Sequence, residues 1–222
     1  THIIITHTHN DHSPLSKLLK EKTGALIYSF DNKSINTGEE NKFEEGYDKE
    51  FVYDVSIKDK DIIKGKDWTL EAIHTPGHTS NHLCYSLKEE KILFSGDHVM
   101  GWSTTVIVPP DGDMEEYMQS LEKLLLRKEQ YYLPTHGKMI KNPLSLVKKY
   151  ITHRLERENQ IEKAIKSGKN KITDIVKIIY ADVDTRLYPA ASMSTLAHLK
   201  RMIKKGQIKV DGSNLDGFYE IN

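Results

Sequence analysis

The chain has 222 residues, of which 37% are hydrophobic and 29% charged, and its 32 basic side chains balance its 32 acidic ones. This composition is typical of one folded domain, or of one large and one small domain, and it excludes a fibrous, disordered or strongly basic nucleic-acid-binding chain. The single cysteine, Cys84, excludes a disulfide scaffold and a zinc site built of cysteines alone. No apolar run approaches the roughly 18 residues of a membrane span, so we expect no membrane partner.

Short strands and one helix are predicted for the first part of the chain. The β-branched run Ile3–Ile5 indicates a buried strand, Ser16–Thr23 a helix ended by Gly24, and Ala25–Phe30 a second strand. Residues 31–50 indicate a loop, made acidic by Glu39, Glu40, Glu44, Glu45 and Asp48. Further strands are expected at Phe51–Val55, Thr69–His74, Leu83–Leu87 and Lys91–Ser95.

The second part of the chain has helical spacing over Met114–Lys128, a short strand at Tyr131–Leu133, and one long helix over Leu144–Ser167. From Lys171 the pattern changes to two helices and a hairpin. These are a helix over Asp174–Tyr180 capped by Thr173, a helix over Ser192–Lys205, and strands at Gln207–Val210 and Gly217–Ile221. Such a pattern is typical of a winged helix. We therefore predict a first domain over 1–150, a linking helix over 151–170 and a winged-helix-like domain over 171–222.

The strongest functional signal is the segment Thr6–His12, which follows the first predicted strand directly. Alternate side chains of an extended segment point the same way, so His7 and His9 can converge on one metal ion. Asp11 and His12 lie on the turn just after and are close enough to serve a second ion. Imidazole nitrogen and carboxylate oxygen are ligands that catalytic zinc uses. The alternative interpretation is that these are surface histidines in a polar loop. That interpretation explains poorly why four potential ligands lie within six positions.

Three later segments also place a ligand-type residue where a predicted strand meets a loop. They are His74–Thr79, Ser95–His98 and Pro134–Gly137, each with glycine or proline to shape the turn. Each segment alone is a weak signal, but four such places in order along one chain indicate a metal site.

This ordered set resembles the signature of the metallo-β-lactamase superfamily, which is His-x-His-x-Asp-His followed by a later histidine, an aspartate and a final histidine. The resemblance implies an α/β fold, the αββα sandwich, with two metal ions at the sheet edges. Because that family has several strands ahead of the motif, it also implies that the first domain is N-terminally truncated. The resemblance assigns His7, His9 and His78 to the first metal, Asp11, His12 and His136 to the second, and Asp97 to a bridge between them.

Two bound metal ions would lower the pKa of a bridging water from about 15.7 to near 7 and so supply hydroxide at neutral pH. Asp11 would orient this nucleophile and accept its proton, which makes Asp11 and Asp97 the candidate catalytic residues. Two zinc ions suit the ligands best, with iron or manganese as alternatives. The ligand set does not choose among ester, thioester, amide and phosphodiester substrates.

Other histidines near these motifs are expected to have supporting roles. His74 is expected to be structural or to hold a ligand, rather than to bind metal. His98, which is next to Asp97, is the best candidate to orient a ligand by a hydrogen bond. His82 and His153 either do the same or lie in the core or on the surface.

The region after Tyr150 resembles the lactamase-beta-2-like branch of this superfamily, as do the segments Gly96–Thr105 and Pro109–Asp113. The best-studied eukaryotic member of that branch is a zinc-dependent endoribonuclease that acts on single-stranded RNA. Many bacterial relatives are labelled as glyoxalase-II-like hydrolases. We expect a cytoplasmic protein, or one of the mitochondrial matrix in a eukaryote.

Some physical arguments favour an RNA partner and others oppose it. Residues 159–222 hold 11 basic and 7 acidic side chains. Their basic cluster attracts phosphate and comprises Lys200, Arg201, Lys204, Lys205 and Lys209. Three aromatic residues, Tyr188, Trp102 and Phe218, could stack bases. Against RNA, the acidic loop would repel phosphate, and a winged helix also serves as a packing module or in a homodimer. Arg154 and Arg157 are interpreted as surface charges paired with Glu158.

We therefore predict a dinuclear zinc hydrolase, with single-stranded RNA ranked above a small ester or thioester as the substrate. A narrow glyoxalase II assignment is disfavoured because the helical glutathione-binding tail is not recognisable. A winged-helix regulator with a degenerate metal domain is disfavoured because no expected ligand is missing. A true β-lactamase would need export, which nothing in this sequence supports.

Overall fold

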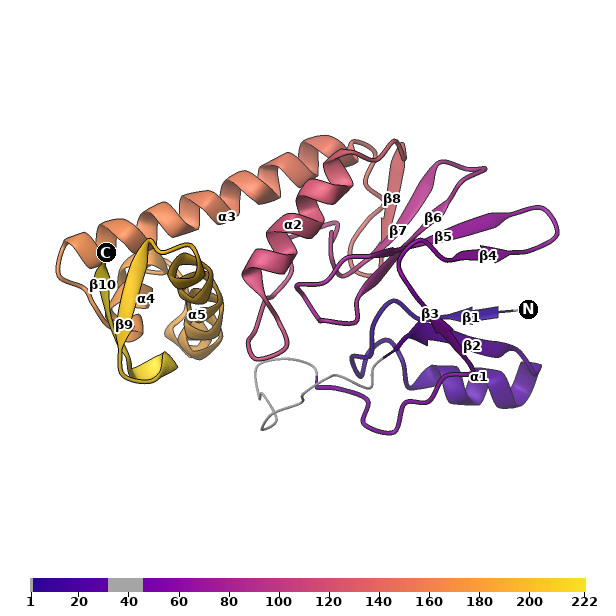
Figure 1. Ribbon diagram of the computed structural model, residues 1–222, viewed down its shortest axis with the longest axis horizontal. Helices are drawn as coiled ribbons and strands as arrows, with labels where there is room; N and C mark the ends of the chain where they lie inside the picture. The colour runs from indigo at the N-terminus through magenta and orange to yellow at the C-terminus, as the bar shows by residue number, and fades with distance from the viewer. Residues whose placement is uncertain (1, 32–45) are drawn as a thin grey trace.

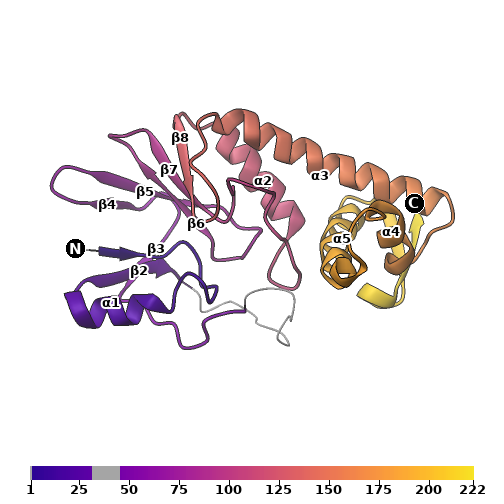
Figure 2. The ribbon, with the colours of Figure 1, turned by 180° about the vertical axis from the view of Figure 1, so that it is seen from behind.

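The computed structural model describes residues 2–31 and 46–222, and it has the layers of an αββα sandwich followed by a smaller helical part (Figure 1). Glu39, Glu40, Glu44 and Glu45 of the predicted acidic loop lie outside the described residues. Two sheets face each other, α1 covers the outer side of one, and α2 and α3 cover the outer side of the other (Figures 1 and 2). The predicted fold class is confirmed.

The first sheet is parallel and has the order β1-β2-β3. Its strands are β1 (His2–Ile4), β2 (Leu26–Phe30) and β3 (Val55–Ile57), and the helix α1 (Leu15–Thr23) connects the first two. Gly24 ends α1 in the left-handed conformation, with φ of 69°, as glycine allows at little cost. The predicted strand Phe51–Val55 is wrong, because residues 51–54 have no partner strand and pairing with β2 starts only at Val55.

The second sheet has the order β4-β5-β6-β7-β8. Its strands are β4 (Ile62–Lys64), β5 (Thr69–His74), β6 (Leu83–Leu87), β7 (Ile92–Gly96) and β8 (Tyr131–Pro134). Because β7 and β8 are parallel, their carboxyl ends reach the same edge of the sheet. One buried cluster, which includes Ile57, Leu70 and Tyr85, fills the space between the two sheets.

The helices α2 (Met114–Leu125) and α3 (Pro143–Lys166) pack on the second sheet. Asp113 begins α2, because its carboxylate accepts a hydrogen bond of 2.9 Å from the backbone N–H of Glu116. A second buried cluster joins both helices to the sheet through side chains such as Leu93, Leu121 and Val147. These packed helices fix the sheet edge at which the candidate ligands gather.

The C-terminal part has its own buried core and lies at the far end of α3 (Figure 2). It comprises α4 (Ile172–Ile179), the 3-10 turn η1 (Thr185–Leu187), α5 (Tyr188–Lys204), β9 (Ile208–Asp211), the 3-10 turn η2 (Asn214–Asp216) and β10 (Phe218–Ile221). The predicted cap at Thr173 is wrong: α4 already begins at Ile172, after Lys171, with no side-chain cap. The helix predicted from Ser192 begins earlier, at Tyr188, with a proline in its first turn.

Arg154 is buried and Arg157 is half-buried, contrary to the surface positions predicted for them, and Arg157 contacts the C-terminal part. Arg154 is buried and donates to the carbonyl of Thr105 at 2.5 Å, because the loop before α2 packs against α3. The Arg157 guanidinium lies over the Tyr180 ring, 4.3 Å from its centroid. The predicted pairing of both arginines with Glu158 is therefore wrong, since Glu158 is bonded to Arg201 instead.

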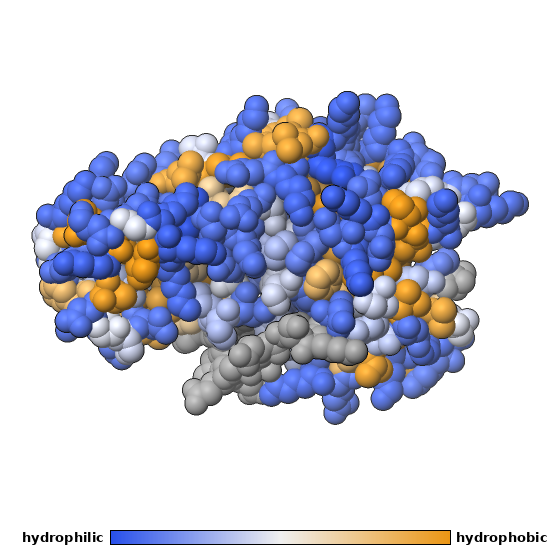
Figure 3. Space-filling model, in the orientation of Figure 1, coloured by the Kyte–Doolittle hydropathy of each residue, from blue (hydrophilic) through white to orange (hydrophobic). Residues whose placement is uncertain are grey.

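The outer surface in Figure 3 is largely hydrophilic and carries small, separate apolar patches. Within residues 2–31 and 46–222, no helix combines the length and the apolar composition needed to cross a membrane. The domain boundaries at residues 150 and 170 stay predictions.

Candidate metal centre

Four loops that follow strand ends build the candidate centre. His7 and His9 follow β1, and His78 follows β5. After His9 the chain turns, because the backbone N–H groups of His12 and Ser13 both donate to the carbonyl of His9, at 3.0 and 3.1 Å. This turn directs Asp11 and His12 back toward the sheet edge where β7 and β8 end. Asp97 and His136 follow those two strands.

Three ring nitrogens converge in the first cluster. His9 Nδ1 lies 3.1 Å from His7 Nε2 and 3.2 Å from His78 Nε2. All three side chains are buried. Burial lowers the pKa of His7 and of His78, and it lowers the pKa of His9 to about 3. The three imidazoles are therefore neutral at pH 7, which is the form that binds metal.

A second cluster joins two histidines and a carboxylate. Asp11 Oδ1 lies 3.2 Å from His12 Nε2, and Asp11 Oδ2 lies 3.1 Å from His136 Nε2. These three residues come from two loops more than a hundred positions apart, and their ligand atoms lie within 4.8 Å of one another. The structure thus brings together the residues that the sequence assigned to a second ion.

Asp97 lies between the two clusters. Its Oδ2 is 3.8 Å from His78 Nε2 of the first cluster. The same oxygen is 3.6 Å from His12 Nε2 and 3.5 Å from His136 Nε2 of the second. Burial acts to raise the pKa of Asp97, but the nearby His12 imidazole and a hydrogen bond from Thr135 outweigh it and hold this pKa well below its usual range. Asp97 is therefore ionised and within reach of both clusters.

The donor set fits divalent metal ions. A tetrahedral zinc ion with bonds of about 2.0–2.1 Å to nitrogen separates its ligand atoms by about 3.3 Å, close to the spacing of the first cluster. The Nδ1 atom of His78 lies 2.7 Å from the carbonyl of Val106, so that this nitrogen carries the proton and donates it. The lone pair of His78 Nε2 then points into the cluster, as a metal ligand requires.

His82, rather than His98, supports the centre. His82 Nε2 accepts a hydrogen bond of 3.1 Å from the backbone N–H of Asp97, and its Nδ1 lies 2.9 Å from Thr75 Oγ1. The expectation for His98 is wrong, because its ring lies against Tyr117, with the centroids 4.8 Å apart, and not against a candidate ligand. The prediction for His98 rested on its position next to Asp97 in the sequence, but neighbouring side chains leave the backbone in different directions.

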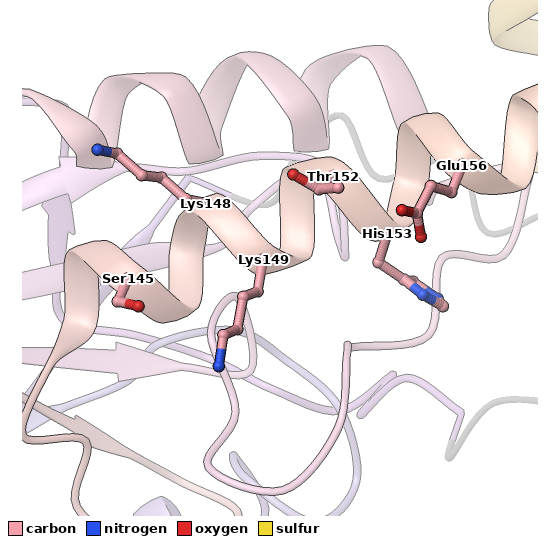
Figure 4. A pocket seen from close by; sticks show the side chains of 6 residues that line it. All are labelled: Ser145, Lys148, Lys149, Thr152, His153 and Glu156. Atoms are coloured by element: carbon pink, nitrogen blue, oxygen red, sulfur yellow. The ribbon is translucent and has the colours of Figure 1, made fainter.

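Two further histidines near the motifs, His74 and His153, have structural or surface positions. His74 Nε2 lies 2.8 Å from the carbonyl of Ser80, and its ring stacks on Phe30, so its predicted structural role is confirmed. His153 is exposed on α3 and lines a groove along that helix beside Lys149 and Glu156 (Figure 4). It therefore lies apart from the candidate ligands.

Most of the centre is buried, and only one side of it is accessible to solvent. His7, His9, His78 and Asp97 are all at most 7% exposed. In contrast, the side chains of Asp11 and His136 are 26% and 32% exposed. A substrate therefore reaches the centre past Asp11 and His136.

Two facing sheets, with clustered imidazoles and carboxylates at the strand ends, are an arrangement typical of hydrolases that use divalent metal ions. Residues 1–136 match the family model of the metallo-beta-lactamase superfamily, and residues 172–217 match that of the beta-lactamase associated winged helix domain. The chain belongs to the metallo-β-lactamase superfamily, whose members are metal-dependent hydrolases. The predicted family, winged helix and enzyme class are confirmed.

Curated relatives agree with this assignment. A "Beta-lactamase-like protein 2 homolog" of Drosophila melanogaster is 37% identical over 153 residues, which are 68% of this chain and 51% of that protein. Its namesake from Caenorhabditis elegans is 31% identical over 213 residues, which are 94% of this chain and 66% of that protein. An "Atrochrysone carboxyl ACP thioesterase" of Aspergillus fumigatus is 36% identical over 112 residues, or 50% and 34% of the two chains. The chain thus spans about half to two thirds of the length of the first two relatives.

A solved structure shows the same fold. A metallo-beta-lactamase family protein from Thermus thermophilus superposes with a TM-score of 0.79, at 17% identity, and the match covers 100% of this chain and 80% of that one. At this identity the likeness concerns the fold alone.

Proposed function

We propose that this protein is a dinuclear zinc hydrolase that cleaves the phosphodiester bonds of single-stranded RNA. The position of Asp97 carries the dinuclear part of this proposal, because one carboxylate oxygen lies within 3.8 Å of ligand atoms from both clusters. A carboxylate so placed can join two ions into one reaction centre.

Each cluster supplies the ligands for one metal ion in this proposal. His7, His9 and His78 would hold the first ion, Asp11, His12 and His136 would hold the second, and Asp97 lies within reach of both clusters. When bound, two divalent ions supply Lewis acidity that activates water and the bond under attack. The nitrogen and oxygen donors favour zinc, with iron and manganese as the alternatives that metal analysis distinguishes.

Asp11 has the position of a base in the reaction. Its carboxylate lies on the open side of the centre, where water and substrate meet, and the rest of the ligand set is mostly buried. There Asp11 orients the attacking water, accepts its proton and releases it to solvent. The His136 imidazole lies beside it and confines the carboxylate to this position.

Basic side chains on the C-terminal part support an RNA substrate. Lys200, Lys204 and Lys205 are exposed at the end of α5, and Lys209 is exposed on β9. Such a group attracts the phosphate backbone of a nucleic acid. Arg201, which the sequence placed in the same group, does not belong to it, because it is buried and bonded to Glu158 and Glu115.

A small thioester is the second candidate substrate. The similarity to the Aspergillus fumigatus thioesterase favours it, since that relative is 36% identical over 112 residues. Two bound ions would supply Lewis acidity for the attack of water on an acyl carbon or on a phosphorus atom, so the ligand set by itself is compatible with both reactions.

The test is to incubate the zinc-loaded protein with 5′-labelled single-stranded RNA and, in parallel, with an S-acylglutathione thioester. Asp97→Ala and His136→Ala each remove one ligand, and His153→Ala is the matched control because His153 is exposed on α3. We expect cleavage of RNA by the wild type and the control, and loss of cleavage in both ligand variants. Intact RNA with metal-dependent turnover of the thioester would replace the nuclease assignment with the second candidate.

A further inference from the structure

The open side of the metal centre carries an exposed aromatic ring. Trp102 is 72% exposed, although the chain on both sides of it returns to buried positions at Val99 and Ile107. Its indole lies almost parallel to the His136 imidazole, with an angle of 6° between the planes and 6.0 Å between the centroids. The indole therefore borders the path by which a substrate reaches Asp11 and His136.

The backbone around Trp102 is held on both sides. The N–H of Gly101 donates to the carbonyl of His136 at 2.9 Å. The hydroxyl of Tyr150, on α3, lies 2.7 Å from the carbonyl oxygens of both Met100 and Ser103. These contacts fix the backbone on both sides of Trp102, whereas most of the ring lies in water.

Two glycines allow the Trp102 loop to contact the His136 loop. A Cβ atom on Gly101 would lie 2.3 Å from the carbonyl oxygen of Lys138. Gly137 has φ of +93°, a conformation that suits glycine, and a Cβ atom there would lie 2.8 Å from the backbone of Gly101. The close approach of the Trp102 loop to the His136 loop is thus built into the backbone.

Single exposed apolar side chains are common on protein surfaces and by themselves need no explanation. Trp102 differs because its backbone is fixed and because it borders the accessible ligands of the centre. A preorganised, flat and exposed ring in such a place is suited to stack on another flat ring.

We infer that Trp102 stacks on a nucleobase next to the bond that is cleaved, an inference that rests on the proposed function. Stacking on an aromatic side chain tolerates any base, which suits a nuclease that acts on single strands. The neighbouring side chains Ser103 and Thr104 are polar. Trp102 is thus a substrate-binding residue that holds the strand over the centre.

The first measurement uses the indole itself as the reporter. The chain has two tryptophans, so Trp68→Phe leaves Trp102 as the sole source of tryptophan fluorescence. This zinc-loaded variant is titrated with a 2′-O-methyl uridine decamer whose integrity is checked on a gel. We expect saturable quenching of the fluorescence with the same Kd as the anisotropy of a labelled decamer.

The second measurement compares variants by anisotropy. We expect Trp102→Ala and Trp102→Leu to bind the decamer roughly 10- to 100-fold more weakly, and Trp102→Phe to stay within a few-fold of the wild type. Leu126→Ala is the control, because Leu126 is 84% exposed and precedes β8, whereas the centre follows the end of that strand. Thermal melts verify that each variant is folded.

The outcomes separate the two proposals. If the wild type neither binds nor cleaves RNA, the proposed function fails, and the base-stacking role of Trp102 fails with it. If the wild type binds and cleaves RNA, but Trp102→Ala binds as tightly and the fluorescence does not change, the proposed function stands and the inference on Trp102 is overturned. Equal binding by Trp102→Leu and Trp102→Phe would likewise show a general apolar contact instead of stacking.

Discussion

Arg201 on α5 points its Nη1 atom at both carboxylate oxygens of Glu158 on α3, at distances of 2.7 and 2.6 Å. Both residues are buried, and Arg201 Nε also donates to Glu115 of α2 at 2.7 Å. One guanidinium thus ties the winged-helix part to the two helices that cover the second sheet. We predicted from the sequence that Arg201 belongs to a basic surface cluster, but the arginine is buried and links three helices.

Removal of this guanidinium should destabilise the protein strongly. Arg201→Met leaves the Glu158 carboxylate buried without its cation, and breaking such a pair typically costs about 3–5 kcal/mol. Urea unfolding of the variant measures this difference in the free energy of unfolding. Lys205→Met is the matched control, since Lys205 is exposed at the end of the same helix, and it should change stability by less than about 0.5 kcal/mol. Equal stability of the two variants would contradict the role of Arg201.

Stability should fall as the pH falls, and His198 should contribute to this slope. His198 is buried, and burial lowers its pKa from 6.5 to about 4, although Glu158, 3.4 Å away, acts in the opposite direction. Between pH 6.5 and 4 the unfolded chain therefore binds a proton at His198 that the folded chain does not. The stabilisation is fully present above pH 6.5 and is lost as the pH falls toward 4.

The variant His198→Gln removes this proton uptake. Urea unfolding at pH 7, 6 and 5 should show a pH slope smaller than that of the wild type by up to about 1.4 kcal/mol per pH unit below pH 6.5. The other buried histidines are present in both proteins, so their contributions cancel in the comparison. Identical slopes would show that His198 does not titrate as its burial indicates.

Loss of the hydrogen bond between His82 and the Asp97 backbone should weaken metal binding, although all candidate ligands stay in place. His82→Asn keeps a polar group near Thr75 but removes the nitrogen that accepts from the Asp97 backbone. Loss of such supporting contacts typically lowers metal affinity by about 10- to 100-fold. Competition with a chromophoric chelator measures the affinity for zinc, with His153→Ala as the control. Unchanged affinity in His82→Asn would assign His82 to the core alone.

Much of the fold follows from local sequence signals. The strands β5 and β6 have the predicted bounds, because apolar side chains recur along each and turn residues lie nearby. The seven candidate ligands also follow strand ends, and the resemblance to the superfamily signature assigned them as the ligand set. The strand β4 was not predicted: Ile62 and Ile63 lie among charged residues, and their strand character comes from pairing with β5, where Ile63 faces Leu70.

What the sequence could not indicate is the environment of single side chains. Arg154 and Arg201 lie on helices with mixed polar faces, and their burial depends on partners far away in the chain, such as Thr105 and Glu115. The choice between His82 and His98 is of the same kind, because only the folded loops decide which ring meets Asp97. The ordered motif shared with the superfamily predicted the ligands, but tertiary packing determines which side chains support them.

The most direct test of the account is the number of zinc ions that one chain binds. We would load the protein with zinc, remove the excess by gel filtration, and measure zinc per chain by mass spectrometry for the wild type and for Asp97→Ala. We expect two ions per wild-type chain and at most one in Asp97→Ala, because Asp97 contacts both clusters. A wild-type chain that saturates with one ion, or a variant that still binds two, would contradict a centre in which Asp97 joins two metals.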